Sequence, residues 1–350
     1  YDGRRVEENA FLLDPLPDQR PENRCRGPPP RFLHGMTSAL RVFLVLGLGC
    51  WAGAAALAQT APSPTAQALA DRAAQAALTQ FSAKKLSADQ LAVTLIDLRD
   101  PSRPQRGSVR GDVQIYPASV VKLFYLAATH RWMEDGKLTD TPELRRAMKD
   151  MIVESSNDAT HYLIDLLTGT TSGPELPDDQ IKVWFDQRNA VNRYFASLGY
   201  TAINANKKPW GDGPYGRETQ ATRLFEQKRN MLTTDATARL LLEIATARCV
   251  TPARSAEMLQ LLARDPGTKE GAADTQARFT GPALPPGSNL WSKAGWTSQT
   301  RHDAAYVELP NGAKFVLVVF TTGHAREQEI IRAVARVVVE GMMNSEARKP

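Results

Sequence analysis

Ser119 and Lys122 are separated by two valines in the sequence. On a helix, residues three apart share one face, so the lysine amine can reach the serine hydroxyl. A serine hydroxyl is a weak nucleophile without a base beside it, and a buried lysine can act as that base because desolvation lowers its pKa. Backbone amides at a helix start could also bind the oxygen of an attacked carbonyl. Alone, this spacing is common and predicts little.

A second polar group, Ser155-Ser156-Asn157, lies where two predicted helices meet. The Ser155 hydroxyl could relay a proton to a leaving group, and the Asn157 amide could hold a substrate carbonyl. The alternative is a helix N-cap, for which Ser and Asn are both favoured.

A third group, Lys293-Ala294-Gly295, lies inside a predicted strand. Lys293 could attract a substrate carboxylate, and Gly295 lets a substrate approach the backbone closely. The backbone N–H of Trp296 could form half of an oxyanion hole, with Ser119 supplying the other half. The alternative is a solvated lysine beside a bulge glycine.

In this order, the three groups resemble the SxxK, SxN and K[T/S]G motifs of class A β-lactamases and penicillin-binding proteins. The flanking segments also resemble that family, over about residues 66–345, and they include SNDATHYLIDLLTG, LPPGSNLWSKAGW and RHDAAYVELPNGAKFVLVVFTTG. The resemblance implies an α+β, β-lactamase/transpeptidase-like fold, in which an antiparallel sheet is flanked by terminal helices and joined to a helical lobe. It implies the following roles: acylated nucleophile Ser119, base partner Lys122, proton relay Ser155, substrate-amide anchor Asn157 and electrostatic anchor Lys293.

Two departures from the family pattern concern substrate binding and deacylation. Ala294 stands where the family usually has Thr or Ser, whose hydroxyl helps to bind the substrate carboxylate. Class A β-lactamases use a loop Glu to activate the deacylating water. Glu218 has the expected location, whereas Glu226 has the expected spacing to an asparagine, Asn230. The alternative for both is a solvated surface carboxylate.

The composition is that of an ordinary globular protein with a mildly basic balance. The chain has 350 residues, 42% hydrophobic and 23% charged, with a formal net charge of +5. We find no run of Lys/Arg with interleaved aromatics, so a nucleic-acid partner is not expected. The cysteines, Cys25, Cys50 and Cys249, form no CxxC pair or metal-ligand cluster, and we expect neither a metal nor a cofactor.

The N-terminal segments predict export. Met36 precedes a short positive start at Arg41, an apolar run and a small-residue cleavage site at Ala58, which together are typical of a signal peptide over 36–58. We expect residues 1–35 to be an upstream extension outside the translated protein. The alternative is a disordered arm before a membrane anchor. Cys50 is a poor match to a lipid-attachment site, so the mature protein is expected to be periplasmic or secreted.

Residues 59–67 are predicted to be a flexible linker before a serine hydrolase domain over 68–345. Hydrophobic periodicity predicts the elements of that domain. Helices are expected over 66–85, 119–136, two within 142–168, 189–198, 234–247 and 327–343. Strands are expected over 91–98, 113–117, 289–296, 303–309 and 313–323. Residues 99–112 read as turns, and residues 201–230 as a long ordered loop.

Three functions remain open. The first is a β-lactamase, which requires a placed loop Glu. The second is a cell-wall D-alanyl peptidase or related amidase or esterase, which predicts no placed Glu and a long-lived penicillin adduct. The third is a non-catalytic binding protein that keeps the fold. We expect a monomer that binds a β-lactam or cell-wall peptide.

Overall fold

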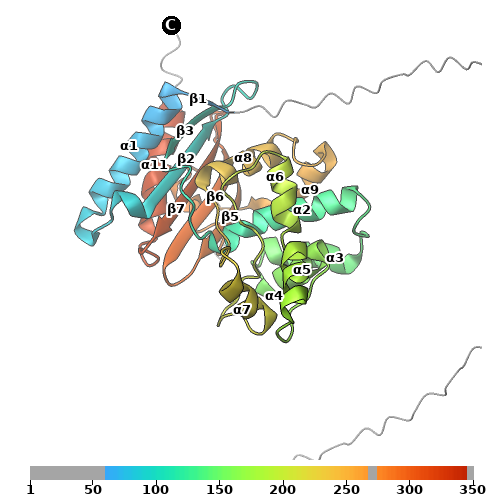
Figure 1. The fold of residues 1–350 in the computed structure, drawn as a ribbon. Helices are drawn as coiled ribbons and strands as arrows, with labels where there is room; N and C mark the ends of the chain where they lie inside the picture. The colour runs from blue at the N-terminus through green and yellow to red at the C-terminus, as the bar shows by residue number, and fades with distance from the viewer. Residues whose placement is uncertain (1–59, 267–273, 345–350) are drawn as a thin grey trace, which may run out of the picture. The chain divides into compact units, whose positions relative to one another are not determined.

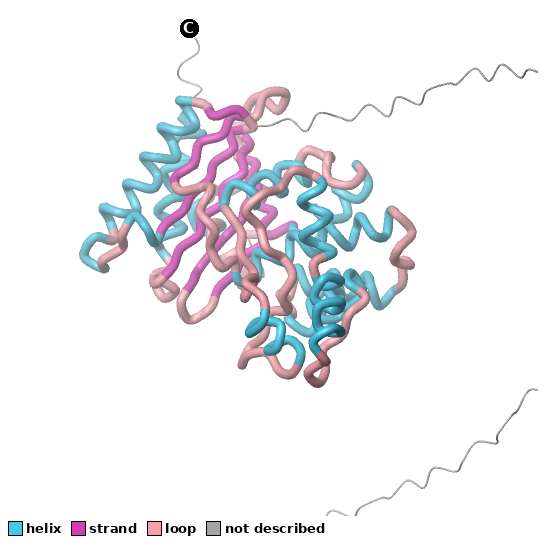
Figure 2. The backbone as a smooth tube through the Cα atoms, in the orientation of Figure 1, coloured by secondary structure: helices cyan, strands magenta, loops and turns pink. Residues whose placement is uncertain are grey.

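The computed structural model describes residues 60–266 and 274–344. The predicted extension 1–35 and signal peptide 36–58 lie outside these residues. Within the described ranges, seven strands form one sheet in the order β1-β3-β2-β7-β6-β5-β4 (Figure 1, Figure 2). The strands are β1 (Ala61–Pro62), β2 (Leu91–Asp97), β3 (Gln105–Val109), β4 (Ala263–Arg264), β5 (Asn289–Trp296), β6 (Thr300–Glu308) and β7 (Lys314–Thr322).

Helices precede, follow and interrupt the strands along the chain. The α-helices are α1 (Pro64–Gln80), α2 (Lys122–Glu134), α3 (Pro142–Ile152), α4 (Asn157–Thr168), α5 (Asp178–Arg188), α6 (Ala190–Ser197), α7 (Arg217–Leu224), α8 (Thr234–Ala245), α9 (Pro252–Leu262) and α11 (Glu329–Met343). Short 3-10 turns are η1 (Ser82–Lys84), η2 (Ala88–Gln90), η3 (Ala118–Val121) and η4 (Gly281–Ala283). None of the helices in the described ranges is long and apolar enough to cross a membrane.

Both faces of the sheet are covered, since every side chain of β2 and all but the two end residues of β7 are buried. Successive side chains of a strand point to opposite faces. In β7, Phe315, Leu317 and Val319 pack with α1 and α11, which lie side by side on one face (Figure 1). The alternate residues Val316 and Val318 belong to the other core, which includes α2, α3, α4 and α8. The sheet therefore supports the helical lobe on one face and the terminal helices on the other.

The N-terminal part of the domain corrects two predictions. The expected flexible linker 59–67 contains β1, which pairs with β3, and the start of α1. The expected strand 113–117 does not form: only Ile115 makes an isolated bridge, to Leu232. The strand lies instead at β3, inside the stretch that was expected to be turns.

Gly107 explains why the pattern of β3 was missed. A Cβ at Gly107 would lie 2.3 Å from the carbonyl carbon of Ala66, so the start of α1 packs directly on this strand. Only glycine permits that approach, and glycine is normally a signal against a strand. Contact with a helix remote in sequence, rather than local propensity, selects the strand conformation here.

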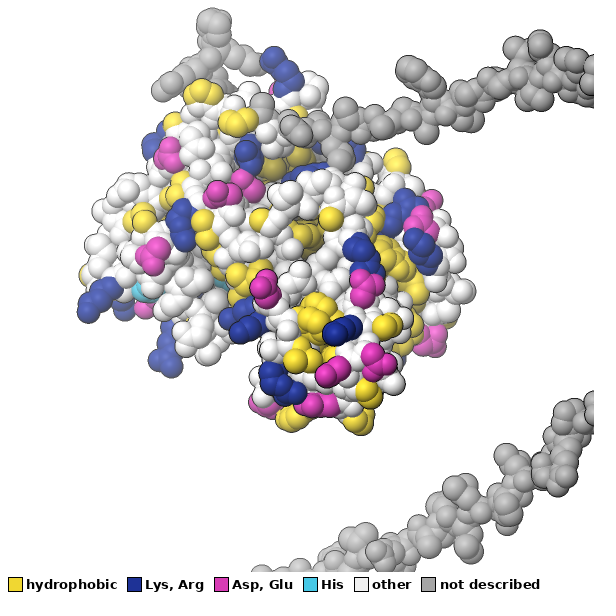
Figure 3. Space-filling model, viewed as in Figure 1, with side chains coloured by type: hydrophobic (Ala, Val, Ile, Leu, Met, Phe, Trp, Pro, Cys, Tyr) yellow, Lys and Arg dark blue, Asp and Glu magenta, His cyan; other side chains and the backbone are white. Residues whose placement is uncertain are grey.

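The remaining predictions agree in type, with boundary differences, and several elements were omitted. The helices α5, α7 and α9 were not expected, and α7 lies inside the predicted loop 201–230. α7 begins after Gly216 and has no side-chain cap, so it lacks the usual start signal. On the face shown in Figure 3, hydrophobic side chains gather over the helical lobe. The helices α4, α5 and α7 of this lobe carry the exposed Leu166, Val183 and Leu224.

Candidate active site

Ser119 lies in the 3-10 turn η3, and Lys122 begins α2. Residues three apart are nearly eclipsed in a 3-10 turn, so both side chains leave the same side. Ser119 is partly exposed, whereas Lys122 is fully buried. Ala118 has φ 46°, a left-handed conformation that is costly for a residue with a Cβ and that clusters at functional sites. The predicted helix therefore starts as a strained turn at the serine.

The Lys122 amine joins the first and second motifs. Its Nζ lies 2.6 Å from the Ser155 carbonyl oxygen and 2.9 Å from Asn157 Oδ1, with Ser155 Oγ at 3.3 Å. Ser155 also has a left-handed backbone, with φ 56°. Lys122 lies 33 residues before Ser155 and 35 before Asn157 in the sequence. The chain returns to Lys122 through α3 and the turn before α4. Ser155 and Asn157 both face the lysine, and Asn157 is exposed to solvent.

The alternative interpretation of the second motif, a helix N-cap, applies to Ser156 only. Ser156 is the N-cap of α4, and its Oγ accepts a hydrogen bond of 3.1 Å from the Ala159 amide. One member of the motif therefore caps the helix. The side chains on either side of it are left to contact Lys122.

Lys293 joins the third motif to the same hydroxyl. Its Nζ lies 3.0 Å from Ser155 Oγ, 2.8 Å from Gln276 Oε1 and 2.8 Å from the Ala294 carbonyl oxygen. Ser155 Oγ thus lies between two buried amines that come from different halves of the fold. Such a hydroxyl can pass a proton from one side to the other.

Burial changes the protonation of both amines. Desolvation lowers the pKa of Lys122 to about 7, because an ammonium group is disfavoured away from water. Burial also lowers the pKa of Lys293 well below its ordinary value, and the nearby Lys122 charge adds to this effect. A substantial fraction of Lys122 is therefore neutral near pH 7, as a general base must be.

The strand β5 passes directly beside the serine turn. A Cβ at Gly295 would lie 2.7 Å from the Pro117 carbonyl oxygen and 2.8 Å from the Ser119 nitrogen. Those are distances that real Cβ atoms essentially never show, so only glycine permits this packing. It brings the backbone of the third motif against that of the first.

The pairing of β5 with β6 leaves one edge of β5 open near Trp296. The Thr297 amide donates to the Thr300 carbonyl, so alternate residues of β5 bond to β6 and those between them face the outer edge. On that edge, the Arg264 guanidinium donates a hydrogen bond to the Ser292 carbonyl oxygen. The Ala294 amide donates a hydrogen bond to Gln276 Oε1. Trp296, 42% exposed, is the next position along the edge. Its N–H faces outward beside the Ser119 turn.

Replacing Gly295 by alanine is expected to slow acylation of Ser119 by about 100-fold, because the added Cβ separates β5 from the serine turn. The rate of labelling by a reactive β-lactam measures this. Gly211→Ala is the matched control, since nothing lies within 4 Å of a Cβ there. An unchanged rate in Gly295→Ala would show that this packing does not position the nucleophile.

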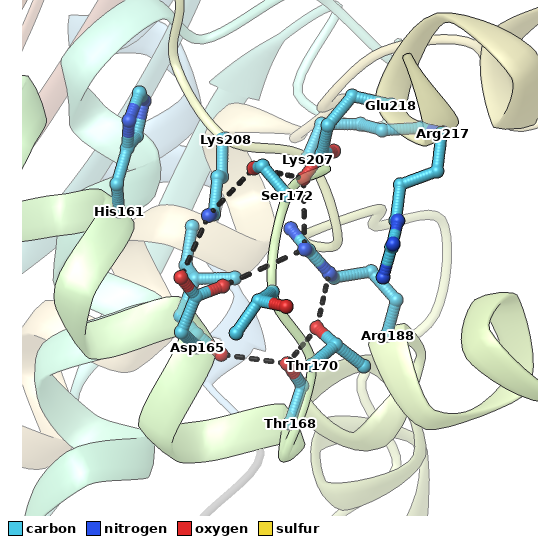
Figure 4. A network of polar contacts seen from close by, with 12 residues as sticks. His161, Asp165, Thr168, Thr170, Ser172, Arg188, Lys207, Lys208, Arg217 and Glu218 are labelled. Carbon is cyan, nitrogen blue, oxygen red and sulfur yellow. Dashed lines mark hydrogen bonds and ion pairs between the residues drawn. The ribbon is translucent and has the colours of Figure 1, made fainter. Parts of the chain in front are cut away.

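Glu218 lies in a buried polar network of the helical lobe (Figure 4). Its Oε1 accepts hydrogen bonds from Arg188 at 2.8 Å and from Ser172 at 2.9 Å. Lys208 in turn bonds Ser172 and Asp165, at 2.9 and 2.8 Å. The carboxylate expected to activate water is therefore committed to a guanidinium. It is also buried, unlike the solvated carboxylate of the alternative interpretation.

The other candidate, Glu226, is exposed and makes no side-chain contact with Asn230 among the described residues. Asn230 instead binds the backbone of Asn206 and Lys207, and the Tyr125 hydroxyl. The four-residue spacing of Glu226 and Asn230 therefore gives no hydrogen bond between their side chains among the described residues. Neither glutamate is held beside Lys122 or Ser155 by a contact of the described residues.

Glu218→Gln is expected to lower the free energy of unfolding by about 2–4 kcal/mol, because it leaves the fully buried Arg188 guanidinium without its nearest counter-charge. Asp165, 3.6 Å from Arg188, limits the loss. Urea unfolding measures it, and the exposed Glu226→Gln should change stability by less than about 0.5 kcal/mol. Lost turnover at unchanged stability would instead identify Glu218 as the base.

Sequence reasoning missed Gln276, which holds Lys293 and Ala294. It lies outside all three motifs, so no local signal marked it. No group of three or more His, Cys, Asp or Glu side chains among residues 60–266 and 274–344 is arranged to hold a metal ion. Cys249 is buried, and burial raises its pKa above the ordinary range.

Comparison with solved structures defines the fold as that of β-lactamases. PBP-A is 18% identical, with a TM-score of 0.56 over 81% of this chain and 99% of its own. A β-lactamase from Chitinophaga pinensis DSM 2588 is 19% identical, with a TM-score of 0.57 over 80% and 99% of the two chains. A β-lactamase from Sphaerobacter thermophilus DSM 20745 is 20% identical, with a TM-score of 0.56 over 80% and 98%. No curated protein matches the sequence.

A sequence model described as the β-lactamase enzyme family matches residues 139–342, more than half of the chain. The chain therefore belongs to the β-lactamase enzyme family of hydrolases. The matched residues include Ser155, Asn157 and Lys293, and they begin after Ser119 and Lys122. The expected α+β fold and family are confirmed.

Proposed function

We propose that this protein is a serine hydrolase that opens β-lactam rings through an acyl-enzyme on Ser119. The observation that carries the proposal is the position of Ser155 Oγ, 3.3 Å from the Lys122 amine and 3.0 Å from the Lys293 amine. Family membership and the packing of β5 against the serine turn support it further.

In the proposed reaction, neutral Lys122 takes the proton of Ser119 as Oγ bonds to the lactam carbonyl carbon. The N–H groups of Ser119 and Trp296 stabilise the resulting oxyanion. The carbonyl re-forms as the ring C–N bond breaks, and the ring nitrogen receives a proton through Ser155 from protonated Lys122. Asn157 holds the substrate amide, and Lys293 attracts its carboxylate. A water molecule then cleaves the ester and restores the Ser119 hydroxyl.

A cell-wall D-alanyl peptidase is the second candidate. The Glu218–Arg188 pair favours it, because Glu218 Oε1 already accepts hydrogen bonds from Arg188 and Ser172 instead of facing a deacylating water. The acylation chemistry is the same, with a peptide carbonyl in place of the lactam. The two candidates differ in how long the penicilloyl ester survives.

Incubation of the purified protein with a fluorescent penicillin and a chromogenic cephalosporin tests the proposal. Fast colour change supports a β-lactamase, and a stable fluorescent adduct without colour supports the peptidase. Absence of both signals contradicts acylation by β-lactams and leaves a non-catalytic binding protein or an unrelated ester substrate.

We further propose that the protein acts as an exported monomer after cleavage near Ala58. The short apolar run and small-residue site of the sequence support the export and the cleavage. Sequencing of the mature N-terminus and size-exclusion chromatography test the two parts.

A further inference from the structure

Gln276 binds the third motif from outside it. The residue lies between β4 and β5 and is fully buried. Its Oε1 accepts hydrogen bonds from Lys293 Nζ at 2.8 Å and from the Ala294 amide at 3.0 Å. The Ala294 N–H can only donate, so the oxygen of the Gln276 amide, rather than its nitrogen, must face it.

The other end of the amide is unsatisfied. Gln276 Nε2 is buried and has no hydrogen-bond partner among residues 60–266 and 274–344. A buried unpaired donor costs about 1–3 kcal/mol. A methionine of similar length would fill the same space without that cost, so packing alone does not account for a glutamine. The two bonds made by its oxygen are what distinguish it from an apolar residue.

The hydrogen bond from Lys293 to Gln276 helps to set the direction of the Lys293 amine. Gln276 Oε1 and the Ala294 carbonyl oxygen accept from the amine on two sides, and the third neighbour is Ser155 Oγ. The same oxygen closes the open edge of β5 at Ala294, two residues before Trp296. One side chain therefore holds both the amine beside the relay hydroxyl and the strand that carries an oxyanion donor.

We propose that Gln276 is a positioning residue of the acyl-transfer site, which holds the Lys293 amine against Ser155 and fixes β5 beside the serine turn. This inference rests on the proposed function. Gln276 acts through Lys293 and β5 rather than by contact with substrate.

The charged groups around Lys293 determine how a new charge at position 276 would affect its protonation. Lys122 approaches from α2, Arg264 from β4, Asp303 from β6 and Asp274 from the segment before Gln276. A glutamate at 276 would keep both acceptor bonds and add a negative charge against Lys293, close to Lys122. Negative charge favours the ammonium form of both lysines.

Gln276→Met and Gln276→Glu separate positioning from packing. We expect Gln276→Met to fold and to slow acylation of Ser119 by a fluorescent penicillin about 10- to 100-fold. Gln276→Glu should recover most of that rate at high pH, with the acid limb of its rate–pH profile moved to higher pH. Gln220→Met is the matched control, because Gln220 is also a buried amide with two backbone bonds but lies in α7.

A second measurement does not depend on catalysis. In ¹⁵N-lysine-labelled protein, the titration of the Lys293 amine, assigned with Lys293→Met, should move to higher pH in Gln276→Glu and stay unchanged in Gln220→Met. An acylation rate within twofold of wild type in Gln276→Met, or an unmoved titration, overturns the inference. If the titration moves but wild type is never acylated, the contact stands and the proposed function fails.

Discussion

Ser119→Ala is expected to abolish covalent labelling by penicillin and to reduce any β-lactam hydrolysis by at least about 1000-fold. The reason is geometric as well as chemical. Ser119 is partly exposed and lies in the turn that packs against Gly295, whereas Lys122 and Lys293 are buried. Mass spectrometry of the intact protein after incubation with penicillin measures the adduct.

Ser155 is the alternative candidate for the nucleophile, since its Oγ lies 3.0 Å from Lys293 Nζ. If Ser155 only relays a proton, Ser155→Ala should still form the adduct, about 100- to 10,000-fold more slowly. Ser156→Ala should lose about 1 kcal/mol of stability, from the α4 cap, without a comparable change in rate. An adduct on Ser155 in Ser119→Ala would reverse the two roles.

Lys122→Met is expected to slow acylation by about 100- to 10,000-fold and to remove its dependence on a group with a pKa of about 7. In wild type, only neutral Lys122 can accept the Ser119 proton. The rate should therefore rise about tenfold per pH unit below pH 7 and level off above it. Stopped-flow acylation across pH 5–9 measures both the rate and the acid limb of its pH profile.

Lys137→Met, at an exposed position in the turn that follows α2, is the control and should retain the wild-type profile. If the acylation rate of Lys122→Met still depends on a group with a pKa near 7, that group is not Lys122.

The same shift affects stability with a defined sign. Between about pH 7 and the ordinary lysine value of 10.5, the unfolded chain holds a proton that folded Lys122 has lost. Its contribution to stability therefore improves as the pH rises through that window. The difference in unfolding free energy between wild type and Lys122→Met should follow this trend.

Much of the site was predictable because its signals are local. The spacing of Ser119 and Lys122, the Ser155-to-Asn157 group and Lys293 within an apolar strand are read from a few neighbouring residues each. The apolar patterns of β2, β5 and β7 are equally local, since burial on the sheet requires them. Together these predicted the α+β fold, and the structure brings Lys122, Ser155, Asn157 and Lys293 into contact.

Only the tertiary structure decided which groups are the partners of those residues. The location of Glu218 in the sequence suggested a base, but its charge is paired with Arg188, which lies 30 residues away and comes from α5. Gln276 carries no motif, and its importance comes from reaching Lys293 and Ala294 across 17 and 18 residues. β3 exists because Gly107 admits the start of α1. In each case the deciding energy is a contact between distant segments, which forms only when the chain is folded.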